Sequence, residues 1–142
     1  MRKMPNPYLQ SLIVALAVVV VDQLSKVIAA KYGWITVNTG VSFGLLGSND
    51  QLVATAVFVG FAVLGILAMQ LYCKKYPLAI GLFLGGAVAN LIDRFLFNGV
   101  RDWLPVVVLP IKNNLADWAI FAAVVLLLFS EWRKGQRKRS LR

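Results

Sequence analysis

Four long apolar segments constrain the fold of this chain more than any other feature. A helix that crosses a membrane needs roughly 20 mostly apolar residues, and segments of that length lie at about 8–30, 52–73, 76–97 and 114–132. They are too long and too continuously apolar for the strands of a membrane barrel. The sequence therefore predicts an all-α membrane protein, a single domain of four transmembrane helices joined by short loops.

The composition argues against the other broad classes of protein. Of the 142 residues, 59% are hydrophobic and 15% are charged, whereas a soluble domain carries about 25% charged residues. Disordered chains have low hydrophobicity, so disorder is excluded as well. The first segment is expected to be a retained span, because Asp22 and Lys26 follow its apolar run where a signal peptide would have a cleavage site.

The net charge of +9 is distributed unevenly along the chain. Ten of the fifteen basic residues lie before the first segment, between the second and third, or after the fourth. Loops rich in Lys and Arg stay in the cytoplasm, so we expect both termini to be cytoplasmic and the other loops to be short and extracytoplasmic. The basic cytoplasmic tail at 133–142 would then anchor the topology by touching anionic membrane lipid, and no nucleic-acid partner is expected.

The ionisable residues limit the chemistry that the chain can support. It has no His and a single cysteine, Cys73, which excludes His-dependent nucleophiles and metal sites built on His or on clustered Cys. Six acids remain: Asp22, Asp50, Asp93, Asp102, Asp117 and Glu131. No group of them has the spacing of a metal site, so neither a metal nor a cofactor is expected.

Four of these acids fall in one layer, at the extracytoplasmic ends of the segments. Asp22 lies in the last third of the first segment and Asp93 lies near the end of the third. Asp102 follows in the loop, and Asp117 lies at the start of the fourth segment. Charged residues within a span are costly and usually functional, so this layer is the predicted site.

Two of the four acids have basic neighbours along the chain. Asp22 and Lys26 are four residues apart, in the order that favours an ion pair on one helical face. Asp93 is followed directly by Arg94. Both pairs are predicted to be structural first, as ion pairs that satisfy polar groups in lipid.

The other two acids are the best pair for catalysis. Two carboxylates that share one proton can activate a water and protonate a carbonyl oxygen, because like charges close together do not both ionise easily. Asp102 and Asp117 fit this role, since neither has a basic partner in helical register. A Ser–Lys dyad of Ser42 and Lys112 is the competing arrangement, but nothing in the spacing of these residues supports a pair.

The same residues resemble those of a known family, lipoprotein signal peptidase, also called signal peptidase II. Five blocks match in family order, and with the four segments they cover most of the chain. The blocks are DQLSK at 22–26, NTGVSFG at 38–44, GGAVANLIDR at 85–94, GVRDW at 99–103 and NLAD at 114–117. Only fifteen residues separate Asp22 from Asn38, fewer than is typical, so the chain resembles a short or divergent member with a small extracytoplasmic platform.

The resemblance implies a function and a set of site residues. It implies a multi-pass protein of the bacterial inner (cytoplasmic) membrane, an aspartyl endopeptidase that removes signal peptides from diacylglyceryl-modified prolipoproteins. The catalytic aspartates fall on Asp102 and Asp117. The positions that bind substrate or support the site fall on Asn38, Gly40, Asn90, Arg94, Asn114, Asp22 and Lys26.

Two functions of other classes stay open at this point. A non-catalytic relative could bind lipid or lipoprotein with the same residues. A small ion pathway is disfavoured, because it needs polar groups along the whole depth of the membrane, and the second segment has only Thr55 and Gln70.

Overall fold

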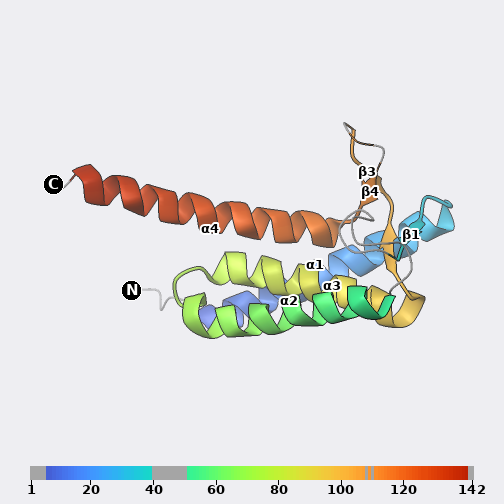
Figure 1. The fold of residues 1–142 in the computed structure, drawn as a ribbon, viewed down its shortest axis with the longest axis horizontal. Helices are drawn as coiled ribbons and strands as arrows, with labels where there is room; N and C mark the ends of the chain where they lie inside the picture. The colour runs from blue at the N-terminus through green and yellow to red at the C-terminus, as the bar shows by residue number, and fades with distance from the viewer. Residues whose placement is uncertain (1–5, 40–50, 108, 110, 141–142) are drawn as a thin grey trace.

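The computed structural model describes residues 6–39, 51–107, 109 and 111–140 (Figure 1). It contains four long helices: α1 (Pro7–Lys31), α2 (Gln51–Tyr72), α3 (Pro77–Phe97) and α4 (Leu115–Ser140). Each helix coincides closely with one predicted apolar segment. The last helix runs further than predicted, into the basic residues after 132, because Lys, Arg and Gln are good helix formers and continue it.

Three of the helices are long and apolar enough to cross a membrane. They are Pro7–Lys31, Pro77–Phe97 and Leu115–Arg137. Within α2, Val59–Tyr72 is a shorter apolar helical stretch. The predicted membrane-helix character is thus confirmed for α1, α3 and α4, while a crossing by α2 and the side of the termini stay predictions.

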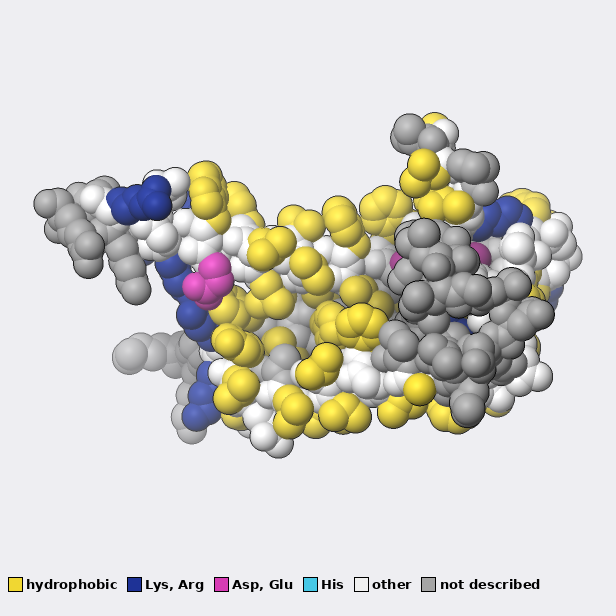
Figure 2. All heavy atoms as spheres, in the orientation of Figure 1, with side chains coloured by type: hydrophobic (Ala, Val, Ile, Leu, Met, Phe, Trp, Pro, Cys, Tyr) yellow, Lys and Arg dark blue, Asp and Glu magenta, His cyan; other side chains and the backbone are white. Residues whose placement is uncertain are grey.

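The surface of the helices is apolar, as a lipid-facing surface would be. Figure 2 shows hydrophobic side chains over the middle of the molecule and basic side chains toward its ends. Leu16 is 66% exposed, Leu64 58% and Leu128 67%. A soluble monomer rarely exposes a continuous apolar surface of this kind, so these side chains indicate contact with lipid.

Helix α3 is the central element and contacts the other three helices. Its buried face carries glycines where the neighbouring backbones approach. A Cβ atom at Gly85 would lie 2.7 Å from the Ala15 carbonyl oxygen of α1. One at Gly86 would lie 2.5 Å from the Ala116 carbonyl oxygen of α4. The close packing of α1 and α4 on α3 therefore requires glycine, which has no side chain, at positions 85 and 86.

Two small antiparallel sheets lie at the end of the bundle opposite both termini (Figure 1). Strand β1 (Thr36–Asn38) pairs with β2 (Val100–Asp102), with Thr36 opposite Asp102. Strand β3 (Leu104–Pro105) pairs with β4 (Lys112–Asn113). The sequence predicts loops in these regions, because strands of two or three residues carry no readable alternation.

A sharp turn joins α3 to β2. Asn98 ends the helix in the left-handed conformation, with φ of 55°, which Asn tolerates better than most residues. Gly99 follows, and a Cβ there would lie 2.7 Å from Val37 Cγ1. The turn therefore folds β2 back beside β1 and over the end of α3.

Candidate active site

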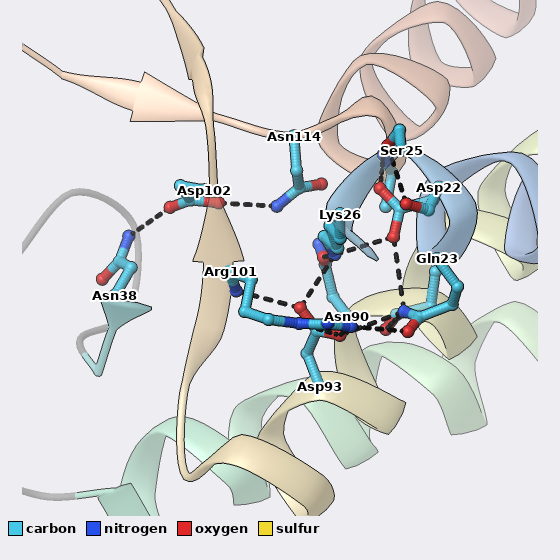
Figure 3. Close-up of polar contacts among 12 residues, drawn as sticks. Asp22, Gln23, Ser25, Lys26, Asn38, Asn90, Asp93, Arg101, Asp102 and Asn114 are labelled. Carbon is cyan, nitrogen blue, oxygen red and sulfur yellow. Dashed lines mark hydrogen bonds and ion pairs between the residues drawn. The ribbon is translucent and has the colours of Figure 1, made fainter. Parts of the chain in front are cut away.

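Polar side chains gather inside the bundle at the end where the sheets lie (Figure 3). They come from α1, α3, β2 and the start of α4. Five of them are completely buried: Asp22, Lys26, Asn90, Asp93 and Asn114. Buried charges are costly unless they are paired and hydrogen-bonded, so their contacts define how the site is built.

Asp102, on strand β2, is 3% exposed and lies between two amide donors. Asn38 Nδ2 donates to its Oδ2 atom at 3.1 Å. Asn114 Nδ2 donates to its Oδ1 atom at 2.7 Å. The β1–β2 pairing and the start of α4 thus hold this carboxylate from opposite sides (Figure 3).

Asp117 lies in the first turn of α4 and is held from α3 and from the helix cap. Asn90 Nδ2 donates to Asp117 Oδ1 at 2.7 Å. The backbone N–H of Asp117 donates to Asn114 Oδ1 at 3.0 Å, as an asparagine at the N-cap does. The single amide of Asn114 therefore contacts both acids, the carboxylate of Asp102 and the backbone of Asp117.

Burial raises the pKa of Asp102 to about 6. The nearby charge of Asp117 raises this pKa further, and the hydrogen bonds from Asn114 and Asn38 oppose the rise. The charge of Arg94, on α3, interacts with both Asp102 and Asp117. Asp102 and Asp117 therefore share one electrostatic environment, to which the charges of Arg94 and Lys26 both contribute.

A second group of charges supports the first from α1 and α3. Lys26 Nζ lies 2.7 Å from Asp22 Oδ2 and 3.0 Å from Asp93 Oδ2. It also donates to Asn90 Oδ1 at 3.4 Å. The predicted pair of Asp22 and Lys26 is confirmed, and Asn90 connects this group to Asp117.

Arg94, the predicted partner of Asp93, does not account for the ion pairs that Asp93 makes with Lys26 and Arg101. Beside Lys26, the structure pairs Asp93 with Arg101, whose Nη2 atom lies 2.7 Å from Asp93 Oδ1. Arg94, the partner expected from its adjacent position, directs its charge toward Asp102 and Asp117. Residues adjacent in a helix point in different directions, which is why the neighbour in sequence is not the partner in space.

Some expectations fall outside the described residues or lack support there. Gly40 and the segment 41–46 lie outside them, as does Ser42. Lys112 Nζ donates to the Trp34 carbonyl oxygen at 2.8 Å, a backbone contact that gives no support to a Ser–Lys dyad. Among residues 6–39, 51–107, 109 and 111–140, no three His, Cys, Asp or Glu side chains are grouped so that they could hold a metal ion.

Comparison with known proteins identifies the family to which this geometry belongs. Residues 14–133 match the family described as "Signal peptidase (SPase) II". The chain belongs to the signal peptidase II family. The resemblance read from the five sequence blocks is thereby confirmed, and membership makes the chain a peptidase of the aspartic type.

Several members of the signal peptidase II family are similar over most of their length. The "Lipoprotein signal peptidase" of Moorella thermoacetica is 38% identical over 138 residues, which cover 82% of this chain and 88% of the relative. That of Campylobacter jejuni subsp. doylei is 32% identical over 112 residues, covering 71% and 67%. That of Syntrophotalea carbinolica is 31% identical over 151 residues, covering 89% and 92%.

Solved structures support the fold of this signal peptidase II family member. A bacterial membrane enzyme determined at 2.3 Å resolution superposes with a TM-score of 0.71 at 22% identity, covering 90% of both chains. A second, at 1.9 Å, gives 0.64 at 23% identity, covering 84% of this chain and 90% of the other. The helical membrane-enzyme architecture is therefore shared with solved structures.

Two residues that hold this signal peptidase II site together were not predicted. Gln23 donates to Asp93 Oδ1 at 3.0 Å and to the Ala89 carbonyl oxygen at 3.1 Å. It also accepts from Arg101 Nη2 at 2.7 Å. A polar residue within a span was an available signal for Gln23. Arg101 offered none, because its partner is eight residues away across the turn at Asn98.

Proposed function

We propose that this chain removes signal peptides from diacylglyceryl-modified prolipoproteins, with Asp102 and Asp117 as the catalytic pair. The observation that carries the assignment is the position of Asn114, whose amide contacts Asp102 at 2.7 Å and the Asp117 backbone at 3.0 Å. One rigid side chain thus fixes the two acids relative to each other. Fixed geometry of this kind is what an enzyme needs to orient a water and a scissile bond.

The proposed reaction is the direct attack of water on the peptide carbonyl. The ionised carboxylate takes a proton from the water while the oxygen of that water bonds to the carbonyl carbon. The protonated carboxylic acid gives its proton to the carbonyl oxygen, forming a tetrahedral diol. Collapse of the diol breaks the C–N bond, and the leaving nitrogen takes a proton from the pair. The two acids titrate as a unit, so the base and the acid are not assigned separately.

The remaining residues support this chemistry by position and charge. Asn38 and Asn90 each donate a hydrogen bond to one of the two acids, and the charge of Arg94 stabilises the negative charge that the pair retains. Asp22 and Lys26 hold the frame of α1 and α3 behind the pair. Gly40 is assigned to the substrate-facing loop by family resemblance.

An apolar cavity in the membrane-spanning part of the bundle suits a lipid-bearing substrate. It has a volume of about 390 Å³ and is lined mainly by residues of α1 and α4, including Val21, Leu115 and Ala119. Leu115 and Ala119 lie two residues before and after Asp117, on a different face of α4. A diacylglyceryl chain or the apolar part of a signal peptide would lie there with the cleaved bond at the level of Asp102.

The proposed orientation follows the distribution of basic residues. Both termini lie at the end of the bundle opposite the sheets (Figure 1). With the basic segments in the cytoplasm, the catalytic pair lies at the outer surface of the bacterial inner membrane, and α2 crosses as the fourth span. Precursors that have been lipidated at that surface would reach the pair by moving within the membrane.

The decisive test uses purified protein and a lipidated precursor peptide. Asp102→Asn and Asp117→Asn should each abolish cleavage while the protein still accumulates in the membrane, and Asp50→Asn, at an acid outside the proposed pair, should cleave normally. Normal cleavage by either of the first two variants would refute the catalytic pair. A wild-type protein that bound the peptide and left it intact would indicate a binding relative.

A further inference from the structure

A second cavity lies at the opposite end of the bundle, where both termini are found. Its volume is about 690 Å³, within the range of roughly 300–1,000 Å³ that is usual for small-molecule sites. Tyr76, at the start of α3, forms one part of its wall, and α4 forms the rest. The α4 side chains include Trp132, Arg133, Lys134, Gln136 and Arg137.

The cavity carries an excess of positive charge. Glu131, the single acid beside it among the described residues, accepts from Lys134 at 3.0 Å and from Lys75 at 3.1 Å. The Tyr76 hydroxyl also bonds to Glu131. Lys75, Lys134, Arg133 and Arg137 thus place four basic side chains around this one described carboxylate, so the cavity and its rim carry a net positive charge.

The residues beside the cavity are of the kinds that favour a membrane interface. Trp132 is 61% exposed, and Phe129, one turn earlier, is 51% exposed. Tryptophan favours the boundary between hydrocarbon and water, and the apolar residues of α4 continue from there toward the membrane centre. The guanidinium of Arg133 lies over the Phe129 ring, 5.5 Å from its centroid. Figure 2 shows the basic side chains at this end, next to the apolar surface.

We propose that this cavity binds the phosphate headgroup of an anionic phospholipid. A guanidinium is planar and carries several donors, so it binds phosphate oxygens in pairs, and basic pockets at the cytoplasmic side of membrane helices are known to hold anionic headgroups. The adjoining apolar surface would receive the acyl chains, which free phosphate lacks. The proposal is independent of the peptidase chemistry; only the assignment to the inner leaflet rests on the proposed orientation.

The test measures lipid retained by the full chain in detergent, by native mass spectrometry. Phosphatidylglycerol and phosphatidylcholine with identical acyl chains are compared, so that only the headgroup charge differs. The double variant Arg133→Gln/Arg137→Gln removes two cations from the wall. The matched control Lys74→Gln/Arg139→Gln removes two from the same end of the molecule at residues outside the lining. Melting temperatures of both variants check that they remain folded.

One phosphatidylglycerol should be retained per chain in preference to phosphatidylcholine. The Arg133/Arg137 variant should bind it about tenfold more weakly or worse, since each basic residue near the surface adds to the attraction, and the control should stay near wild type. Equal retention of the two lipids would overturn the proposal, and so would equal loss in the two double variants. Displacement of the lipid by excess inorganic phosphate would reassign the cavity to a free anion.

Discussion

Arg101 donates three hydrogen bonds to Asp93. Its backbone N–H reaches Asp93 Oδ2 at 2.9 Å, and its Nε and Nη2 atoms reach Oδ1 at 3.3 and 2.7 Å. Asp93 belongs to α3, and Arg101 immediately precedes Asp102 on β2. The guanidinium also lies 3.8 Å from the centroid of the Phe97 ring. This pair therefore fixes the strand that carries one proposed catalytic acid to the central helix.

Removing Asp93 should destabilise the fold more than removing Arg101. Asp93→Asn leaves Arg101 without its carboxylate inside the bundle and leaves Lys26 paired with Asp22 alone, and breaking a buried pair in this way costs about 3–5 kcal/mol. Arg101→Gln leaves Asp93 its contact with Lys26 at 3.0 Å. Thermal melting in detergent should therefore rank wild type first, Arg101→Gln second and Asp93→Asn last.

The double variant tests whether the two residues act together. Combining Arg101→Gln with Asp93→Asn should cost clearly less than the sum of the two single losses, because residues in direct contact are not additive. Exact additivity would show that the two side-chain hydrogen bonds contribute nothing to stability.

The reaction should depend on pH near the pKa of Asp102. This pKa is raised to about 6, so the carboxyl holds its proton below that pH and loses it as the pH rises. The proposed pair needs one proton to donate, and kcat/KM should therefore fall as the pH rises through about 6. A profile that instead rises through this range would contradict the role of Asp102 as part of a proton-sharing pair.

Asn38 should influence the pH at which kcat/KM falls. Its hydrogen bond to Asp102 lowers the pKa of the carboxyl, so Asn38→Ala should raise this pKa and move the fall in kcat/KM to higher pH. Asn113→Ala is the matched control, because the Asn113 amide accepts from Trp118 at 3.1 Å and lies on a neighbouring strand. A shift of the same size in the control would mean that the change is not specific to Asp102.

Asn114→Ala should reduce activity by about 100-fold, since a misplacement of reacting groups by an ångström can cost that much. The variant loses the donor to Asp102 and the cap of α4 together. Single-turnover cleavage of a lipidated peptide measures this, with melting temperature recorded in parallel. If the activity loss merely followed the fraction of unfolded protein, Asn114 would be a helix cap and nothing more.

Close packing of α4 on α3 should be required for the site. Gly86→Ala places a Cβ atom 2.5 Å from the Ala116 carbonyl oxygen, next to Asp117. Overpacking of this kind costs about 1–3 kcal/mol, and the displaced helix start should lower both stability and cleavage. Gly60→Ala in α2 meets nothing within 4 Å and should leave both unchanged.

The sequence predicted well the extent of the helices and the layer in which the acidic residues lie, because both depend on local information. Apolar length predicts a membrane helix, and the layer that contains Asp102 and Asp117 followed from where the segments end. The pairing of residues across the turn at Asn98 could not be predicted from the sequence. Arg101 contacts Asp93 only because a residue in the left-handed conformation reverses the chain. The short sheets were missed for a similar reason, since pairing of two or three residues is set by tertiary contacts.

Asp22 Oδ1 accepts a hydrogen bond from the backbone N–H of Ala116 at 2.9 Å. The first helix thereby supplies part of the cap of the last one, 94 residues later in the chain. A nascent chain that emerges from its N-terminus can complete this contact only when its final helix has been inserted. The geometry at Asp117 therefore forms only after α4 has joined α1, so a chain in which α4 is not inserted lacks the assembled candidate site.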